Sequence, residues 1–289
     1  MELPKGKLIA IGGNEDKGSE QEPCVEQKNN INFFELQILS RILLEIKGHQ
    51  NSHVEVITTA SSIPEEVGEA YIAAFGKLGN KRVKLMHIKN REDARNPEYI
   101  ERIRNCDGVM FTGGNQLRLS TIFGGTEILK ILHKRYCHED FVIAGTSAGA
   151  MAMSNTMIYQ GSSAGALLKG EVKITTGLAF IKDVIIDSHF DKRGRFGRVA
   201  QAVAANPGCI GIGLGEDTGV LIIESRFLEV IGSTHVTIVD GHEMLHSNIA
   251  ELQEGCPISI ENLKVHILTK GNCYDLHKRK FIKETSMAK

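Results

Sequence analysis

The sequence predicts an α/β protein with a mostly parallel β-sheet, helices on both faces of that sheet and an antiparallel C-terminal extension. Over the first two thirds of the chain, short β-branched runs alternate with amphipathic stretches, which is the pattern of a helix-covered parallel sheet. Beyond Gly161 the runs are shorter and richer in strand-forming residues, with turn signals at Gly232-Ser233 and Asp240-Gly241. These features indicate an antiparallel extension of the same sheet.

The length and composition of the chain favour a single domain. At 289 residues it is near the upper size at which one hydrophobic core still grows. The hydrophobic fraction of 42% and the charged fraction of 24% are typical of a globular protein, and no repeat or linker is evident. We therefore expect one domain over residues 1–289, with a core from about residue 7 to residue 280.

The alternation of strands and helices can be followed element by element. The first strand is predicted at 7–12, and a long helix at 31–46, where isoleucine, leucine and phenylalanine recur at intervals of three and four. Gly48 supplies the end of this helix. The further elements are, in chain order, a strand at 53–59, a helix from about 64, a strand at 83–88, a helix at 97–105, a strand at 108–112, a helix at 116–135 and a strand at 141–144.

Charge and hydropathy argue against several classes of partner. The chain has 34 Lys and Arg residues against 35 Asp and Glu, so no net field attracts nucleic acid or an anionic membrane. The apolar run at 8–11 is too short for a signal peptide, and no run approaches the roughly 18 apolar residues that span a bilayer. The six cysteines show no C-x-x-C spacing, which favours reduced thiols. We expect a cytoplasmic protein.

Two stretches match G-x-S-x-G, the nucleophile elbow of serine hydrolases. In Gly145–Gly149 an apolar strand precedes the motif and small helix-forming residues follow, so the backbone can turn sharply and expose the hydroxyl of Ser147. Gly161–Gly165 also matches, but the residues before it are mixed in character and a glycine soon follows. The context favours Ser147 as the nucleophile and places Ser163 in a loop over the site. A tight turn with an incidental serine is the structural alternative.

A serine nucleophile needs a base, and the base needs a carboxylate that fixes its tautomer. Of eleven histidines, His189 is distinguished because it follows a strand at 184–187 that ends in polar residues. Sites of α/β sheets collect at such strand ends. Glu216 follows a glycine-rich strand and is our first candidate for the acid, with Asp217 and Asp187 as alternatives.

A glycine turn after the strand at 108–112 is the candidate oxyanion hole. We expect the N–H groups of Gly114 and Ala148 to form it, each donor being worth about 3 kcal/mol to the transition state. The alternative is a glycine turn that serves geometry alone. The tripeptide Gly12-Gly13-Asn14 shows that the motif is not unique in this chain.

A basic run follows His189 and contains Arg193, Arg195 and Arg198. Guanidinium groups bind carboxylates in bidentate fashion, and the near-neutral chain does not favour phosphate contacts. We interpret the run as a carboxylate-binding cluster for an acidic substrate group. The alternative is that the basic run is a solvated face of the protein without a binding role.

Two further patterns are judged incidental. Residues 242–246 read H-E-x-x-H, which binds zinc only when a helix places both histidines on one face, and the stretch as far as Leu252 is compatible with a helix. No third ligand or open coordination position is evident. Gly211-x-Gly213-x-Gly215 lacks a third glycine at dinucleotide-binding spacing. The sequence therefore predicts no metal and no cofactor.

Four stretches together resemble the cyanophycinases. They are FTGGNQ at 111–116, GTSAGA at 145–150, DSHFDKRGRFGR at 187–198 and GIGLGEDTG at 211–219. The resemblance runs from about residue 7 to residue 280 and implies a flavodoxin-like fold similar to class I glutamine amidotransferases and aspartyl dipeptidases. It also implies a metal-independent serine exopeptidase, often dimeric, that cuts cyanophycin (multi-L-arginyl-poly-L-aspartate) into β-aspartyl-arginine.

The resemblance also assigns residues. It implies Ser147 as nucleophile, His189 as base and Glu216 as orienting acid. The positions similar to the family's substrate pocket are Gln116, Asp187, Ser188, Arg193, Arg195 and Arg198, and the family commonly has Gln where Ser188 stands. Two other functions stay open: an aspartyl or isoaspartyl dipeptidase with the same triad, and a non-catalytic amidotransferase-like binding module.

Overall fold

The structure is a computed structural model that describes residues 3–18 and 37–282. A nine-stranded sheet in the order β17-β16-β11-β10-β1-β5-β4-β2-β3 forms its centre. Five of its strands are parallel and form the half predicted from the alternating pattern. They are β1 (Lys7–Ile11), β5 (Val142–Thr146), β4 (Gly108–Phe111), β2 (Val54–Ile57) and β3 (Val83–Met86).

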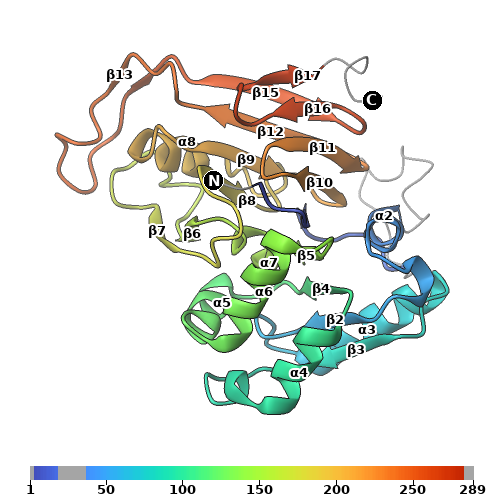
Figure 1. The fold of residues 1–289 in the computed structure, drawn as a ribbon. Helices are drawn as coiled ribbons and strands as arrows, with labels where there is room; N and C mark the ends of the chain where they lie inside the picture. The colour runs from blue at the N-terminus through green and yellow to red at the C-terminus, as the bar shows by residue number, and fades with distance from the viewer. Residues whose placement is uncertain (1–2, 19–36, 283–289) are drawn as a thin grey trace.

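The other half of this sheet is antiparallel and comes from the C-terminal third of the chain. It consists of β10 (Thr218–Ile223), β11 (Phe227–Gly232), β16 (Cys273–Asp275) and β17 (Lys280–Ile282). β1 joins the two halves, because it pairs in parallel with β5 and antiparallel with β10. In Figure 1 the orange and red C-terminal strands lie at the opposite end of the molecule from β2 and β3.

The remaining long strands form a second, four-stranded sheet. Its members are β15 (Lys264–Thr269), β12 (His235–Asp240), β9 (Ile210–Leu214) and β8 (Val184–Asp187). The prediction that the C-terminal strands all extend one sheet is therefore wrong in part. Strands β9 and β12 carry apolar residues that pack on both faces, with Ile212 and Ile238 in the main core and Val239 against helix α8. β10 of the large sheet is also buried on both faces, so the burial pattern of a strand does not specify which sheet the strand joins.

Helices cover both faces of the large sheet, as predicted (Figure 1). Side chains of α2 (Gln37–Glu45) and α3 (Pro64–Lys77) share one core cluster with inward residues of β1, β2 and β5. The helices on the other face are α4 (Pro97–Asn105), α5 (Gln116–Phe123), α6 (Glu127–His138) and α7 (Ala148–Met151). Helix α8 (Phe196–Ala205) packs on the second sheet.

Several short elements complete the described chain. They are the 3-10 helices η1 (His49–Asn51) and η2 (Asp93–Arg95), and the two-stranded sheets of β6 (Thr156–Gln160) with β7 (Lys173–Thr176) and of β13 (His246–Ser247) with β14 (Ile260–Glu261). Helices long and apolar enough to cross a bilayer are absent from the described residues.

Two predicted helices differ from the structure. The helix predicted at 31–46 is present from Gln37 to Glu45, and residues 31–36 lie outside the described part of the chain. The helix predicted at 116–135 is two helices, because Gly124-Gly125 interrupts it and Gly125 adopts a positive φ of 75°. The Thr126 hydroxyl then accepts the N–H of Leu129 and begins α6 as its N-cap.

Candidate active site

Ser147 lies at a sharp turn between β5 and α7. Its backbone has φ 49° and ψ −110°, an unusual conformation for a residue with a side chain, which costs about 1–3 kcal/mol. Both glycines of the motif are required sterically: a Cβ on Gly145 would lie 2.7 Å from the Gly149 carbonyl carbon, and one on Gly149 would lie 2.4 Å from the Phe111 oxygen. The Ser147 N–H donates to the Ile11 carbonyl at 2.8 Å, which ties the turn to β1.

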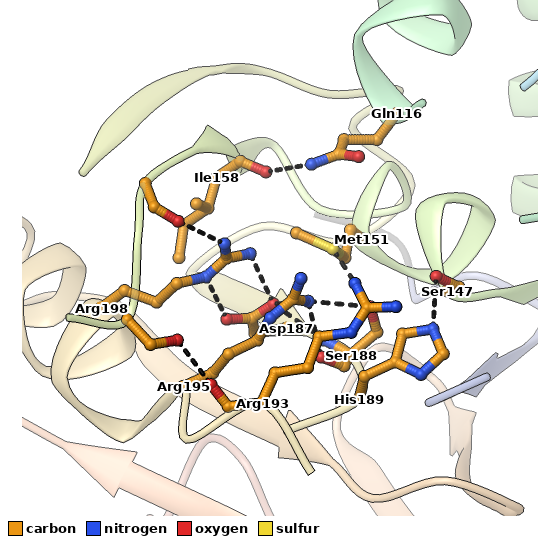
Figure 2. A network of polar contacts seen from close by, with 12 residues as sticks. Gln116, Ser147, Met151, Ile158, Asp187, Ser188, His189, Arg193, Arg195 and Arg198 are labelled. Carbon is orange, nitrogen blue, oxygen red and sulfur yellow. Dashed lines mark hydrogen bonds and ion pairs between the residues drawn. The ribbon is translucent and has the colours of Figure 1, made fainter. Parts of the chain in front are cut away.

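Three predicted side chains form one chain of hydrogen bonds. Ser147 Oγ lies 3.1 Å from His189 Nε2, and His189 Nδ1 lies 2.7 Å from Glu216 Oε1. Figure 2 shows the imidazole turned toward the serine hydroxyl. Because Nδ1 faces a carboxylate, it carries the ring proton, and Nε2 is left to accept the serine proton.

The segment after β1 positions the imidazole. The His189 N–H donates to the Gly12 carbonyl at 2.8 Å, and His189 itself has a positive φ of 47°. A Cβ on Gly13 would lie 2.4 Å from the ring carbon Cε1, so the ring packs directly on a glycine backbone. Asn14 hydrogen-bonds to Glu216. The segment at 11–14 therefore contacts all three members of the Ser–His–Glu chain.

Burial and nearby charges shift the pKa values of both His189 and Glu216. Burial lowers the pKa of His189, and the charges of Arg193 and Arg195 lower it further against the opposing effect of Glu216. Burial alone would raise the pKa of Glu216, but its hydrogen bonds to His189 and Asn14 outweigh that effect and hold the pKa below its usual value. At neutral pH the site therefore holds a neutral imidazole and a carboxylate.

The alternative acids have other partners. Asp217 is buried, accepts the Asp16 N–H at 3.0 Å and the hydroxyl of Ser233, and burial raises its pKa to about 6. Asp187 is fully buried and bound by arginines. Among the described residues, Glu216 is the carboxylate bonded to His189.

The second G-x-S-x-G stretch is a loop, as its context predicts. Residues 161–165 belong to neither a strand nor a helix, and Ser163 is exposed. Its hydroxyl donates to the backbone carbonyl of Arg193 at 2.5 Å. Ser163 thus contacts the segment that borders the candidate site, whereas Ser147 contacts the imidazole.

The three arginines of the basic run occupy different positions. Arg198 holds Asp187 in a bidentate pair at 2.6 and 2.8 Å, and Arg195 contacts the same carboxylate at 3.0 Å (Figure 2). Both guanidinium groups are therefore paired inside the protein. Arg193 is exposed and lines the same cavity as Ser147.

Two other predicted pocket residues contact protein groups (Figure 2). Gln116 donates to the Ile158 carbonyl at 3.0 Å and ties the start of α5 to β6. The buried Ser188 hydroxyl contacts Met151 Sδ at 3.3 Å.

The cavity beside Ser147 has a volume of about 570 Å³. Gly113 and Gly114 line it together with His189 and Arg193. Ala148 is the first residue of α7, so its N–H has no partner within that helix. Gly114 has φ 138°, and a Cβ there would lie 2.0 Å from the Ala60 oxygen, which restricts the position to glycine. The cavity thus combines a hydroxyl, a neutral imidazole and a glycine turn.

Sequence reasoning missed a polar cluster behind the serine. Buried Glu15 accepts hydrogen bonds from the Thr146 hydroxyl at 2.6 Å and from the Tyr71 hydroxyl, and pairs with Lys17 at 2.8 Å. Its position directly after a predicted strand and a glycine turn is the signal that could have found it, because α/β sites gather at the carboxyl ends of strands.

The H-E-x-x-H stretch does not form a helix. Residues 241–245 are turn and coil, and His246 begins the short strand β13. The two histidines therefore lack the shared helix face that the zinc pattern requires.

The α/β fold and the Ser–His–Glu chain are typical of serine hydrolases. The chain matches Peptidase family S51 over residues 29–230, and it belongs to this family of serine-type peptidases. It is 34% identical to a cyanophycinase of Trichormus variabilis, over 95% of this chain and 87% of the relative. It is 34% identical to one of Synechococcus elongatus, over 94% and 80%, and 32% identical to one of Geminocystis herdmanii, over 94% of both.

A solved structure supports the fold. A peptidase from an acI-B1 Actinobacterium aligns with a TM-score of 0.64, over 95% of this chain and 98% of its own, at 20% identity. The predicted class, an α/β fold with a large, mostly parallel sheet and helices on both faces, is confirmed.

Proposed function

We propose that this protein is a cyanophycinase, a serine exopeptidase that hydrolyses cyanophycin and releases β-aspartyl-arginine. The observation that carries the proposal is the hydrogen-bonded chain from Ser147 through His189 to Glu216 beside a cavity of about 570 Å³. The name shared by relatives that match almost the whole chain supports the choice of substrate.

The proposed reaction is an acyl transfer in two stages. His189 Nε2 takes the proton of Ser147 Oγ, which attacks the carbonyl carbon of the α-peptide bond between two consecutive aspartates. The N–H groups of Gly114 and Ala148 stabilise the oxyanion. His189 then donates the proton to the leaving amine, the C–N bond breaks, and a serine ester remains.

Water completes the cycle. His189 accepts a proton from a water molecule that attacks the ester, and returns it to Ser147 Oγ as the acid product leaves. Glu216 stays ionised and stabilises the imidazolium in both stages, which agrees with its lowered pKa. In this scheme no metal is needed.

We also propose that six positions shape substrate recognition. Arg193, which lines the cavity, contacts a substrate carboxylate. The paired Asp187, Arg195 and Arg198 form a rigid wall next to it, because a buried bidentate pair holds its geometry. Gln116 holds the backbone of β6 near that wall, and the Ser188 carbonyl accepts a hydrogen bond from Arg195.

The proposal includes a homodimer in the cytoplasm. Disulfide bonds are absent among the cysteines of the described residues, which agrees with a reducing compartment. Light scattering on the purified protein should give twice the chain mass of 31.7 kDa. A mass of one chain at micromolar concentration would contradict the dimer.

Incubating the purified protein with cyanophycin tests the function. We expect β-aspartyl-arginine in the mass spectrum of the products, and a loss in turnover on the order of 10⁴ to 10⁶ for Ser147→Ala. Ser163→Ala is the matched control and should keep most of the activity, because Ser163 contacts Arg193 and not the imidazole. Faster cleavage of small aspartyl dipeptides than of the polymer would instead indicate a dipeptidase.

A further inference from the structure

One face of helix α3 borders the active-site cavity. The cavity is lined by the N-cap residue Ile63 and by the helix residues Glu66, Val67, Ala70 and Tyr71, which recur at intervals of three and four. Ile63, Val67 and Ala70 form an apolar strip, and Ile63 is 52% exposed at its end. This wall can therefore cover methylene groups of a ligand.

Lys17 projects into the same cavity and is held in place. Its ammonium lies 2.8 Å from Glu15 Oε1 and 4.9 Å from the centre of the Tyr71 ring, and its side chain is 25% exposed. Burial raises the pKa of Glu15, but the Lys17 charge and the hydrogen bonds to the carboxylate outweigh it, so Glu15 stays ionised. An ammonium has three N–H donors, and Lys17 uses two of them on Glu15, at Oε1 and at the backbone carbonyl 3.4 Å away, which leaves one for a ligand.

Lys17 and Glu66 give this side of the cavity one positive and one negative charge, which complement a ligand with both a carboxylate and a cation. Glu66 is exposed to the cavity and forms no ion pair within residues 3–18 and 37–282, whereas its neighbour Glu65 pairs with Lys89 at 3.2 Å. The wall thus carries a cation, an apolar strip and an anion. In β-aspartyl-arginine the arginine is attached through its amine, so its carboxylate and guanidinium stand at the two ends of an aliphatic chain.

We propose that Lys17, Glu66 and the apolar strip of α3 form a subsite for the arginine branch of the substrate. Lys17 binds the arginine carboxylate, Glu66 binds the guanidinium, and the strip covers the methylene groups. This inference rests on the proposed function and deepens it by assigning residues that recognise the branch. Arg193 is then available for the free α-carboxylate of a terminal aspartate, because the side-chain carboxyl is amidated by arginine.

Lys17 and Glu66 differ in burial, so we expect them to contribute differently to the affinity for the arginine branch. Lys17 is partly buried and preorganised, and hydrogen bonds between charged groups in such settings are worth about tenfold or more in affinity. Glu66 is exposed and screened by solvent, so its contribution is roughly two- to fivefold. The subsite should therefore select the branch carboxylate more strongly than the guanidinium.

The test uses three synthetic oligo-aspartyl substrates with different branches: arginine, agmatine, which lacks the carboxylate, and citrulline, which lacks the side-chain charge. The wild type should prefer arginine over agmatine by about tenfold in kcat/KM and over citrulline by roughly two- to fivefold. Lys17→Met should abolish the first preference and keep the second. Glu66→Gln should do the reverse.

The matched control is Glu65→Gln, which removes an acid from the same helix turn and should keep both preferences. Equal losses on all three substrates in Lys17→Met would overturn the subsite, because they would show that Lys17 only supports Glu15. A wild type that cleaves arginine and agmatine substrates equally would also overturn it while leaving the proposed function intact.

Calorimetry on Ser147→Ala separates the two proposals. We expect this variant to bind β-aspartyl-arginine more tightly than β-aspartyl-agmatine, and the additional change Lys17→Met to remove the difference. Selective binding without hydrolysis by the wild type would support the subsite and contradict the proposed function. Equal binding of both ligands would contradict the subsite.

Discussion

Ser147 and His189 both have positive φ angles, of 49° and 47°. Such backbone conformations cost free energy and persist only where surrounding contacts impose them. Here the N–H groups of both residues donate to consecutive carbonyls, those of Ile11 and Gly12, at the end of β1. The hydroxyl and the imidazole are therefore aligned by backbone hydrogen bonds before any substrate arrives.

The buried position of His189 predicts the pH dependence. Its pKa is lowered, so the imidazole stays neutral below the ordinary value of about 6.5, and the acid limb of kcat/KM should lie at lower pH than that. The positive charge of Arg193 contributes to the lowering, so Arg193→Gln should move the limb to higher pH. Rate profiles from pH 4 to 9 measure both positions. A limb that stays unchanged in Arg193→Gln would contradict this assignment.

Glu216 has the opposite effect to Arg193 on the pKa of His189, and so on the acid limb of kcat/KM. Its hydrogen bond raises the pKa of His189, so Glu216→Gln should shift the limb further toward acid pH. Turnover should also fall by a factor on the order of 10⁴, because the amide favours the wrong tautomer of the ring. Full turnover in this variant would show that the carboxylate does not orient the base.

Sequence reasoning reached Ser147, His189 and Glu216 because each follows a recognisable strand, and strand ends converge at one edge of an α/β sheet. It did not find the Glu15–Lys17 pair: Glu15 does follow a strand and a glycine turn, but two opposite charges at such a place are equally typical of a solvated loop. Nor could it show that Arg195 and Arg198 hold Asp187, because pairing depends on the packing of α8 against β8.

At the level of elements, the apolar runs located the strands of the parallel half within a few residues. The prediction of one continuous helix at 116–135 was wrong because the amphipathic pattern continues across Gly124-Gly125, where the backbone turns. The second sheet was missed because the pattern of a strand predicts which faces are buried, and it does not specify the neighbouring strand.

Substitutions at two glycines, Gly149 and Gly76, test the packing of these elements. Gly149→Ala places a Cβ 2.4 Å from the Phe111 oxygen, so we expect a loss of about 1–3 kcal/mol in the free energy of unfolding and a large loss of activity. Gly76→Ala, in helix α3, meets no atom within 4 Å and should stabilise the protein by about 0.5–1 kcal/mol. Urea unfolding measures both, and equal stability of the two variants would contradict the packing described.

At the scale of the molecule, the candidate site lies where the two sheets meet. Ser147 follows a strand of the nine-stranded sheet, and His189 follows a strand of the four-stranded sheet. Glu216 lies in the connection from β9 to β10, which crosses from one sheet to the other. The site therefore requires both sheets to be in place.

We propose that the whole chain unfolds as one unit. β1 pairs with β5 on one side and with β10 on the other, so the N-terminal and C-terminal parts of the chain share a sheet. Far-ultraviolet circular dichroism and tyrosine fluorescence should report a single coincident transition in urea. Two separated transitions would show independent domains.

The most direct measurement of the Ser147–His189 pair is labelling with a fluorophosphonate probe, followed by peptide mapping. We expect Ser147 to carry the label, Ser163 to stay unlabelled, and His189→Ala to lose labelling while keeping its folded circular dichroism spectrum. Labelling of Ser163 in place of Ser147, or unchanged labelling without the imidazole, would contradict the account.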